Sequence, residues 1–146
     1  MSLRAIPLTV VPFLLYSILV LFSGGDGTVD GATAAKNFLA TEIFGLNMMS
    51  GARWSFTWGD IILVVTLVVL FIEILKATYT STASLIDHGL SMLVFIVALI
   101  FFLMSQQAAT SVFFLIIVAL LIDVVAGFII GIRVARRDIG LGTADQ

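Results

Sequence analysis

The sequence predicts an all-α membrane protein, an up-down-up-down bundle of four transmembrane helices that forms a single domain over residues 1–146. Composition is the first observation behind this prediction. Hydrophobic residues make up 61% of the chain and charged residues only 11%, and the mean hydropathy is +1.22, whereas about a quarter of a soluble domain is charged. The second observation is that four apolar runs approach the roughly 20 residues that a helix needs to cross a bilayer. Such runs are too long for strands, and helices satisfy their own backbone groups in lipid.

The loops between these runs predict how the helices are connected. Short loops near residues 78–86 and 105–110 favour antiparallel neighbours. A cleaved signal peptide is the alternative for the first run, because Arg4 precedes it and Ala32-Thr33-Ala34 resembles a cleavage site. The expected spans are residues 6–22, 59–77, 87–105 and 110–133.

The distribution of basic residues predicts that both termini lie in the cytoplasm. An even number of crossings places the termini on the same side as the loop after the second span. That side carries most of the Lys and Arg residues, and cytoplasmic loops are enriched in both. A cytoplasmic tail is therefore expected over residues 134–146. The residues on this side are Arg4, Lys76, Arg133, Arg136 and Arg137, against Lys36 and Arg53 on the other, with Arg133, Arg136 and Arg137 expected to anchor the boundary.

The loop between the first two spans, Ser23 to Gly59, is the one sizeable extramembrane segment that the sequence predicts. Its start, Ser23-Gly24-Gly25-Asp26-Gly27, is polar and rich in glycine. Apolar residues at helical spacing predict a short amphipathic helix at about 34–49, either on the outer leaflet or packed over the bundle. Trp54 and Trp58, with Phe56 between them, are expected in the outer aromatic belt. Ligand binding by these tryptophans is the alternative.

Asp123 lies inside the fourth apolar run, ten residues before Arg133, which corresponds to about 15 Å of helix. A carboxylate at such a depth costs at least ~2.5 kcal/mol on insertion scales, so it should face other helices or a polar cavity. One hypothesis is a proton-binding or ion-binding site. The other is an interhelical hydrogen bond that fixes packing.

A second group of charges is expected at the cytoplasmic boundary. Glu73 and Lys76 are three residues apart and can pair on one helix face. Asp87 and His88 open the third span across a short loop, so all four should lie at similar depth. A proton relay from Asp123 through Glu73 to His88 is one hypothesis. An interfacial salt-bridge network, with Asp87 as a helix cap, is the other.

Small residues recur at helical spacing on the last two spans, which predicts faces for close helix packing. Gly127 and Gly131 form a GxxxG pattern, which allows two helix backbones to approach closely. The predicted packing residues are Ala119, Gly127 and Gly131 around Asp123 on the fourth span, and Ser91, Ala98 and Ser105 on the third.

Several chemistries find no support in the sequence. Cysteine is absent, which excludes disulfides, thiolate metal sites and cysteine nucleophiles. His88 is the single histidine, so bis-histidine haem binding is not expected, and no metal or other cofactor is predicted. The net charge of −2 gives no electrostatic basis for binding nucleic acid.

Four stretches resemble segments of small, uncharacterised four-span inner-membrane proteins of proteobacteria. The resemblance covers roughly the last two-thirds of the chain and leaves most of the Ser23 to Gly59 loop outside it. It implies a bacterial inner membrane and carries no activity. The stretches are Glu73-Ile-Leu-Lys-Ala-Thr, Ile-Asp87-His88, Leu-Ile-Asp123-Val-Val-Ala-Gly127 and Ala-Arg-Arg-Asp138.

The expected function is that of a non-enzymatic accessory or scaffolding subunit of a bacterial inner-membrane complex. Faces of small residues suit helix–helix contact, and catalytic motifs are lacking. The expected partners are membrane lipids and either another membrane protein or a second copy of the chain. A small proton-coupled transporter or channel component that uses Asp123 is the alternative, and a membrane enzyme is a third hypothesis.

Overall fold

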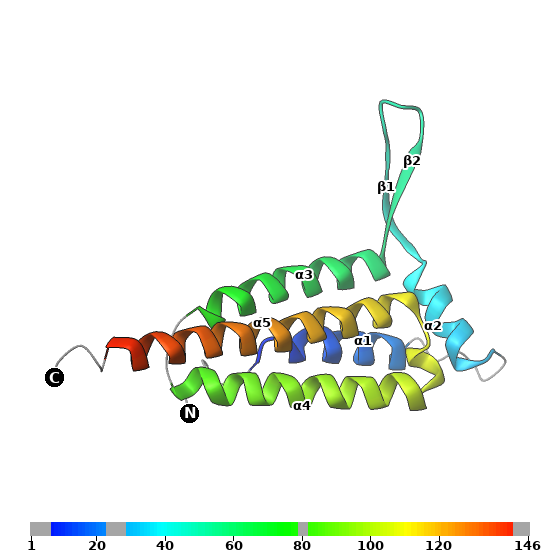
Figure 1. Cartoon of the computed structure of the whole chain (residues 1–146). Coiled ribbons are helices and arrows are strands. Elements are labelled where there is room, and N and C mark those ends of the chain that lie inside the picture. The colour runs from blue at the N-terminus through cyan, green and yellow to red at the C-terminus, as the bar shows by residue number, and fades with distance from the viewer. Residues whose placement is uncertain (1–6, 23–28, 79–81, 142–146) are drawn as a thin grey trace.

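The structure is a computed structural model that describes residues 7–22, 29–78 and 82–141, apart from the side chains of residues 82–86 and 134–141 (Figure 1). Within these residues the chain is mostly helical. The elements are α1 (Val10–Phe22), α2 (Gly31–Leu39), β1 (Glu42–Asn47), β2 (Arg53–Thr57), α3 (Trp58–Ala77), α4 (Thr82–Met104), the short 3-10 helix η2 (Gln106–Ala108) and α5 (Ser111–Leu141).

Three of the helices are long and apolar enough to cross a membrane. The qualifying segments are Trp58–Ala77 of α3, Asp87–Met104 of α4 and Ser111–Arg133 of α5. Their side chains that face away from the bundle are mainly large and apolar, for example Leu67 on α3 and Leu103 on α4, at 63% and 73% exposed. Such surfaces fit a lipid environment, and the prediction of apolar membrane-compatible helices is confirmed for these three.

Helix α1 is shorter than the span predicted for it. It has 13 residues, which is about 20 Å of helical rise, against roughly 30 Å of hydrocarbon core. The helix begins only at Val10, whose N–H bonds the carbonyl of Pro7. Pro12 is then the third helical residue, a position at which its missing N–H leaves no bond unmade. The first predicted residue of this span, residue 6, and Arg4 lie outside the described residues.

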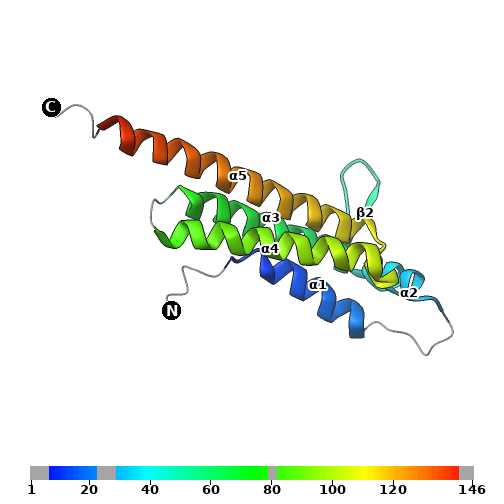
Figure 2. The same ribbon diagram turned by 60° about the horizontal axis from the view of Figure 1, so that its bottom comes forward.

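The four apolar helices surround a common core. Helix α5 makes extensive contacts with both α3 and α4, and α1 packs mainly on α3. Figure 2 shows α5 and α1 on opposite sides of α3 and α4. Helix α4 begins, and α3 and α5 end, at what we call the terminal end of the bundle, and the start of α1 points toward that end (Figure 1). Helix α2, η2 and the β-hairpin lie at the opposite, hairpin end.

Aromatic rings fill the core toward the hairpin end. Tyr16 and Phe113 are fully buried, with ring centroids 4.7 Å apart. The Tyr16 hydroxyl donates to the carbonyl of Gln107 at 2.8 Å and lies 2.6 Å from Thr110 Oγ1, so it ties α1 to the loop before α5. We call this group the aromatic core, and its members are Phe13, Tyr16, Phe101, Phe102 and Phe113.

Replacement of Tyr16 with phenylalanine is expected to lower the free energy of unfolding by about 1 kcal/mol, because a buried hydrogen bond is lost without a change in ring packing. Thermal unfolding in detergent measures this loss. Ser17→Ala is the control, since among the described residues the Ser17 hydroxyl bonds only the Phe13 carbonyl of its own helix. Equal stability of the two variants would contradict the role given to the Tyr16 hydroxyl.

The predicted surface helix at residues 34–49 is wrong over its second half. Helix α2 begins at Gly31, where Asp30 caps it by accepting from the Thr33 N–H at 3.0 Å, and it ends at Leu39. Strands β1 and β2 follow and pair antiparallel. Their turn uses Gly51 at a φ of 83°, which glycine adopts without steric cost. The all-α prediction is corrected to this extent.

Two helices extend beyond the membrane spans predicted for them, although their candidate spans, Asp87–Met104 and Ser111–Arg133, agree with the prediction. Helix α4 begins at Thr82, five residues before the expected start of the third span at Asp87. Helix α5 continues to Leu141, so much of the segment predicted as a tail is helical. Residues 23–27, predicted as a flexible start of the outer loop, lie outside the described residues.

Candidate functional site

Buried polar side chains from three helices, and from the residue just before a fourth, converge near the terminal end of the bundle. All but one of them are less than 9% exposed, and the exception is a lysine whose side chain is 23% exposed. We call this group the polar cluster. It consists of Thr9 just before α1, Glu73 and Lys76 of α3, Asp87, His88 and Ser91 of α4, and Asp123 of α5.

Lys76 connects two of the carboxylates. Its Nζ lies 3.1 Å from Glu73 Oε2 and 3.0 Å from Asp87 Oδ2. The predicted salt-bridge network is therefore present, and it joins α3 to α4. The predicted helix cap is wrong, because α4 begins at Thr82 and leaves Asp87 inside the helix, where it pairs with Lys76.

Glu73 also holds the start of α1. Its Oε1 accepts a hydrogen bond from the backbone N–H of Leu8, 65 residues away in sequence. Backbone N–H groups at the start of a helix have no partner within that helix, so a buried one needs an acceptor from elsewhere. Glu73 supplies that acceptor and fixes where α1 enters the bundle.

Asp123 is 2% exposed and is surrounded by hydroxyl groups and charges. Thr9 Oγ1 lies 3.5 Å from its Oδ2. Ser91 of α4 lies beside the same carboxyl, and His88 and Lys76 are near enough to interact with it electrostatically. Ser91 Oγ is buried, and no described residue gives it a hydrogen bond of normal geometry. The structure thus brings all five predicted candidates, Asp123 among them, into one cluster.

His88 packs directly on Gly127 of α5. A Cβ built on Gly127 would lie 2.5 Å from Cε1 and 2.9 Å from Cγ of the imidazole, closer than real Cβ atoms come. Gly127 therefore makes room for the ring. Gly131 is different, because a Cβ there would meet nothing within 4 Å. Only the first glycine of the GxxxG pattern is in a close helix contact within the described chain.

Of the other residues predicted to pack between helices, some do so and others do not. Ala98 of α4 and Ala119 of α5 are buried, at 0% and 7% exposed, as their spacing predicts. Ser91 is buried as well, but it belongs to the polar cluster. Ser105 follows the last residue of α4 and is half-buried, so it is not part of the α4 packing face.

The polar cluster does not extend through the bundle in the described part of the chain. Toward the hairpin end the interior is filled by the aromatic core, with Tyr16 and Phe113 fully buried. Thr66, between the two regions on α3, donates to the carbonyl of Ile62 in its own helix at 2.7 Å. In the same residues, no three His, Asp or Glu side chains are grouped in a way that fits a metal ion.

The β-hairpin has two chemically different faces. On one face the rings of Phe44, Trp54 and Phe56 contact one another beside Leu46, with ring centroids 4.9 to 6.3 Å apart. Phe44 and Phe56 are stacked, and Trp54 meets both edge-to-face. We call these four residues the aromatic face. Phe44, Leu46 and Trp54 are 46%, 53% and 47% exposed, so bundle and α2 leave them uncovered.

The opposite face of the hairpin is polar. Arg53 donates to Glu42 at 2.5 Å across Gly45, where a Cβ would collide with both side chains. This hydrogen bond lowers the pKa of the Glu42 carboxyl, which therefore stays ionised at neutral pH. The hairpin is thus amphipathic. The strands alternate, and a register shift between Glu42 and Phe44 places Glu42 beside Arg53 and not on the aromatic face.

The structure describes the side chains of some, but not all, of the residues predicted to anchor the protein at the membrane boundaries. Trp54 is on the aromatic face, whereas Trp58 stacks on Phe38 of α2 with ring centroids 5.8 Å apart. Arg133 is exposed on α5 beyond the polar cluster. The side chains of Arg136 and Arg137 lie outside the described residues.

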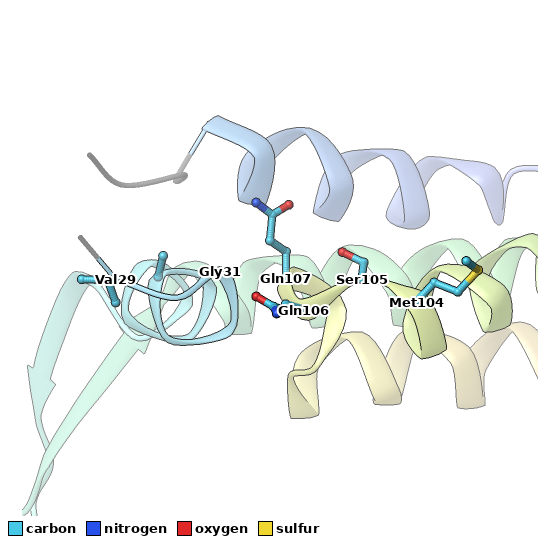
Figure 3. Close-up of a pocket in the computed structure, with 7 residues that line it drawn as sticks. Val29, Gly31, Met104, Ser105, Gln106 and Gln107 are labelled. Carbon is cyan, nitrogen blue, oxygen red and sulfur yellow. The ribbon is translucent and has the colours of Figure 1, made fainter. Parts of the chain in front are cut away.

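A cavity of about 550 Å³ opens at the hairpin end, between α2 and the end of α4 (Figure 3). Two glutamine carboxamides provide hydrogen-bonding groups, and the lining includes no ionisable side chain. The cavity has no link in the described residues to the polar cluster at the other end. The lining residues are Val29, Gly31, Ala34, Met104, Ser105, Gln106 and Gln107.

Sequence reasoning missed two members of the polar cluster. Thr9 was not singled out, although it is the one hydroxyl residue in the first half of an apolar run. Ser91 was assigned to packing, although it lies four residues after Asp87 and thus on the same helix face. No family model, curated protein or solved structure matches the chain.

Proposed function

We propose that the protein is a non-enzymatic accessory or scaffolding subunit of a bacterial inner-membrane complex. In this proposal α3, α4 and α5 cross the bilayer, and α1 crosses it together with the non-helical residues that precede it. The terminal end faces the cytoplasm, and the hairpin lies on the outer surface. The single observation that supports it best is the uncovered aromatic face on a hairpin that projects from the bundle (Figure 1). Exposed apolar patches of this kind mark interaction sites.

The base of the hairpin is held firmly. Thr57 and Asp60 form a reciprocal capping box at the start of α3, in which the Thr57 N–H donates to Asp60 Oδ2 at 2.8 Å. Trp58 stacks on Phe38, and Gly59 lets α3 approach α2 and α5, because a Cβ there would lie 3.3 Å from the carbonyl of Leu39 and 3.0 Å from Val112. An arm fixed at its base loses little conformational freedom on binding, which favours affinity.

The direction of the hairpin indicates where the partner lies. It rises on the side of α3 and stands across the direction of the helices (Figure 1). If the helices stand perpendicular to the bilayer, the hairpin therefore lies along the outer membrane surface. It would then extend over a protein that packs against α3 within the membrane. Leu67, Val68 and Phe71 of α3 are 63%, 53% and 63% exposed below it. A membrane protein beside α3 would contact both surfaces.

A triple substitution of the aromatic face tests the proposal. Phe44→Ser, Leu46→Ser and Trp54→Ser together are expected to weaken the complex by more than tenfold, because truncation of a single hot-spot residue of an interface, often a tryptophan, costs about 2 kcal/mol or more. The readout is native gel migration after extraction from native membranes in mild detergent. Asn47→Ala with Ser55→Ala on the polar face is the matched control.

Two outcomes would contradict the proposal. One is a wild-type protein that migrates alone as a monomer at every protein-to-lipid ratio tried. The other is a complex that the aromatic-face variant leaves intact. The melting temperature of the bundle, measured for both variants, separates loss of the partner from loss of the fold.

A small proton-coupled transporter or channel component built on Asp123 is the second candidate, and the burial of that carboxylate favours it. Transport would need a polar path through the region that the aromatic core fills. The candidate predicts a pH-dependent flux in liposomes that Asp123→Asn removes. Liposomes containing the wild-type protein that show no such flux would reject it.

A further inference from the structure

The polar cluster contains more acidic groups than its cations can balance. Its carboxyls are those of Glu73, Asp87 and Asp123, and its possible cations are Lys76 and His88. Even with both cations charged, three ionised carboxylates would leave one negative charge uncompensated among the described side chains. Burial of such a charge costs several kcal/mol, and proteins avoid the cost by neutralising the group.

Two of the three carboxyls are paired directly with a cation. Glu73 and Asp87 both contact the Lys76 ammonium within 3.1 Å. Glu73 also accepts the N–H of Leu8. Donors of this kind stabilise a carboxylate, and protonation of the carboxyl would weaken its interaction with them.

Asp123 has a different environment, which suits a neutral carboxyl. The groups nearest its oxygens include the hydroxyls of Thr9, just before α1, and Ser91 on α4, and a hydroxyl can either donate or accept. The imidazole of His88 also interacts with it electrostatically. Ser91 is 1% exposed, and its Oγ has no hydrogen-bond partner in the described chain. A proton on Asp123 gives this oxygen a donor to accept from.

We propose that the polar cluster is a proton-binding site, in which Asp123 carries the proton at neutral pH and donates it as a hydrogen bond to Ser91 Oγ. The facing ionisable groups are Glu73 and Lys76 on α3 and Asp87 and His88 on α4, and α1 contributes Thr9. Lys76, at 23% exposed, is where the site approaches solvent. The bound proton lets α1, α4 and α5 pack around a carboxyl without net charge.

Infrared spectroscopy of the full-length protein in lipid nanodiscs tests the proposal. A protonated carboxyl has a carbonyl band that a carboxylate lacks. At neutral pH the wild type is expected to show this band, and Asp123→Asn is expected to lose the intensity of one carboxyl. Asp60→Asn at the hairpin end is the control and should leave the band unchanged. A band that survives in Asp123→Asn, or is absent from the wild type, overturns the proposal.

Ser91→Ala provides a second measurement that keeps the aspartate in place. The band is expected to keep its intensity but to move to higher frequency, because the carboxyl loses its acceptor. A purely structural serine would leave the frequency unchanged. Exchange of K⁺ for Na⁺ in the buffer is the last comparison. Loss of the band in Na⁺ would show that the site takes a metal cation instead of a proton, which contradicts the proposal.

Discussion

Replacement of Lys76 with methionine is expected to lower the free energy of unfolding by about 3–5 kcal/mol, the range measured when one partner of a buried ion pair is removed. Lys76 contacts two carboxylates, Glu73 and Asp87, which are only 2% and 3% exposed. Methionine has a similar length and no charge, so packing of the chain is largely kept. Both carboxylates would then be buried without their cation.

Unfolding by denaturing detergent in mixed micelles measures the effect. Lys36→Met on the exposed surface of α2 is the matched control and should change stability by little. A triple variant, Lys76→Met with Glu73→Gln and Asp87→Asn, should recover much of the loss, because it removes the carboxylates along with the cation. A single Lys76→Met variant as stable as the wild type would show that the ion pairs contribute nothing.

The sequence predicted the long helices well because their signal is continuous. Helices α3, α4 and α5 each contain an apolar segment of 18 residues or more, and in lipid only a helix can satisfy such a backbone by itself. Helix α1 was predicted too long, because the apolar run includes Pro7 and Leu8. The backbone forms turns over these residues and not a helix. A hydropathy profile does not show this, because it does not distinguish proline, which lacks a backbone N–H, from other apolar residues by hydrogen bonding.

The β-hairpin was not predicted because the apolar residues of a short amphipathic segment can match both the helical and the strand periodicity. Ile43, Leu46 and Met49 recur every three residues, which is typical of a helix, while Phe44 and Leu46 alternate, which is typical of a strand. The deciding signal was the alternation of Trp54 and Phe56 in the partner strand. A strand is stable here only because it pairs with another, and this information is not local.

The polar cluster could be predicted in part, because buried charges are few and helix hairpins bring particular pairs together. The proximity of Glu73, Lys76 and Asp87 follows from the short connection between α3 and α4, which places the end of one helix beside the start of the other. The addition of Asp123 and Thr9 depends on which faces of α5 and α1 point inward. Those faces are fixed by packing of whole helices, which the spacing of residues along one helix does not reveal.

Replacement of Gly127 with alanine is expected to destabilise the protein by about 1–3 kcal/mol, the usual cost of forcing extra atoms into a packed interior. The new Cβ would lie 2.9 Å from Cγ of His88, an atom at the base of the ring that cannot swing aside. His88 is itself 6% exposed, so its ring has no free space to enter. Helices α4 and α5 would have to move apart.

Gly131→Ala is the matched control on the same helix, because nothing lies within 4 Å of its Cβ position. It should leave stability unchanged or raise it, since alanine favours helix over glycine by up to about 1 kcal/mol. The clash also predicts that His88→Ala relieves the effect of Gly127→Ala in a double-mutant cycle. Additive losses in that cycle, or equal effects at the two glycines, would mean that the imidazole does not set the distance between α4 and α5. The GxxxG pattern would then act as a unit, through a contact outside this chain.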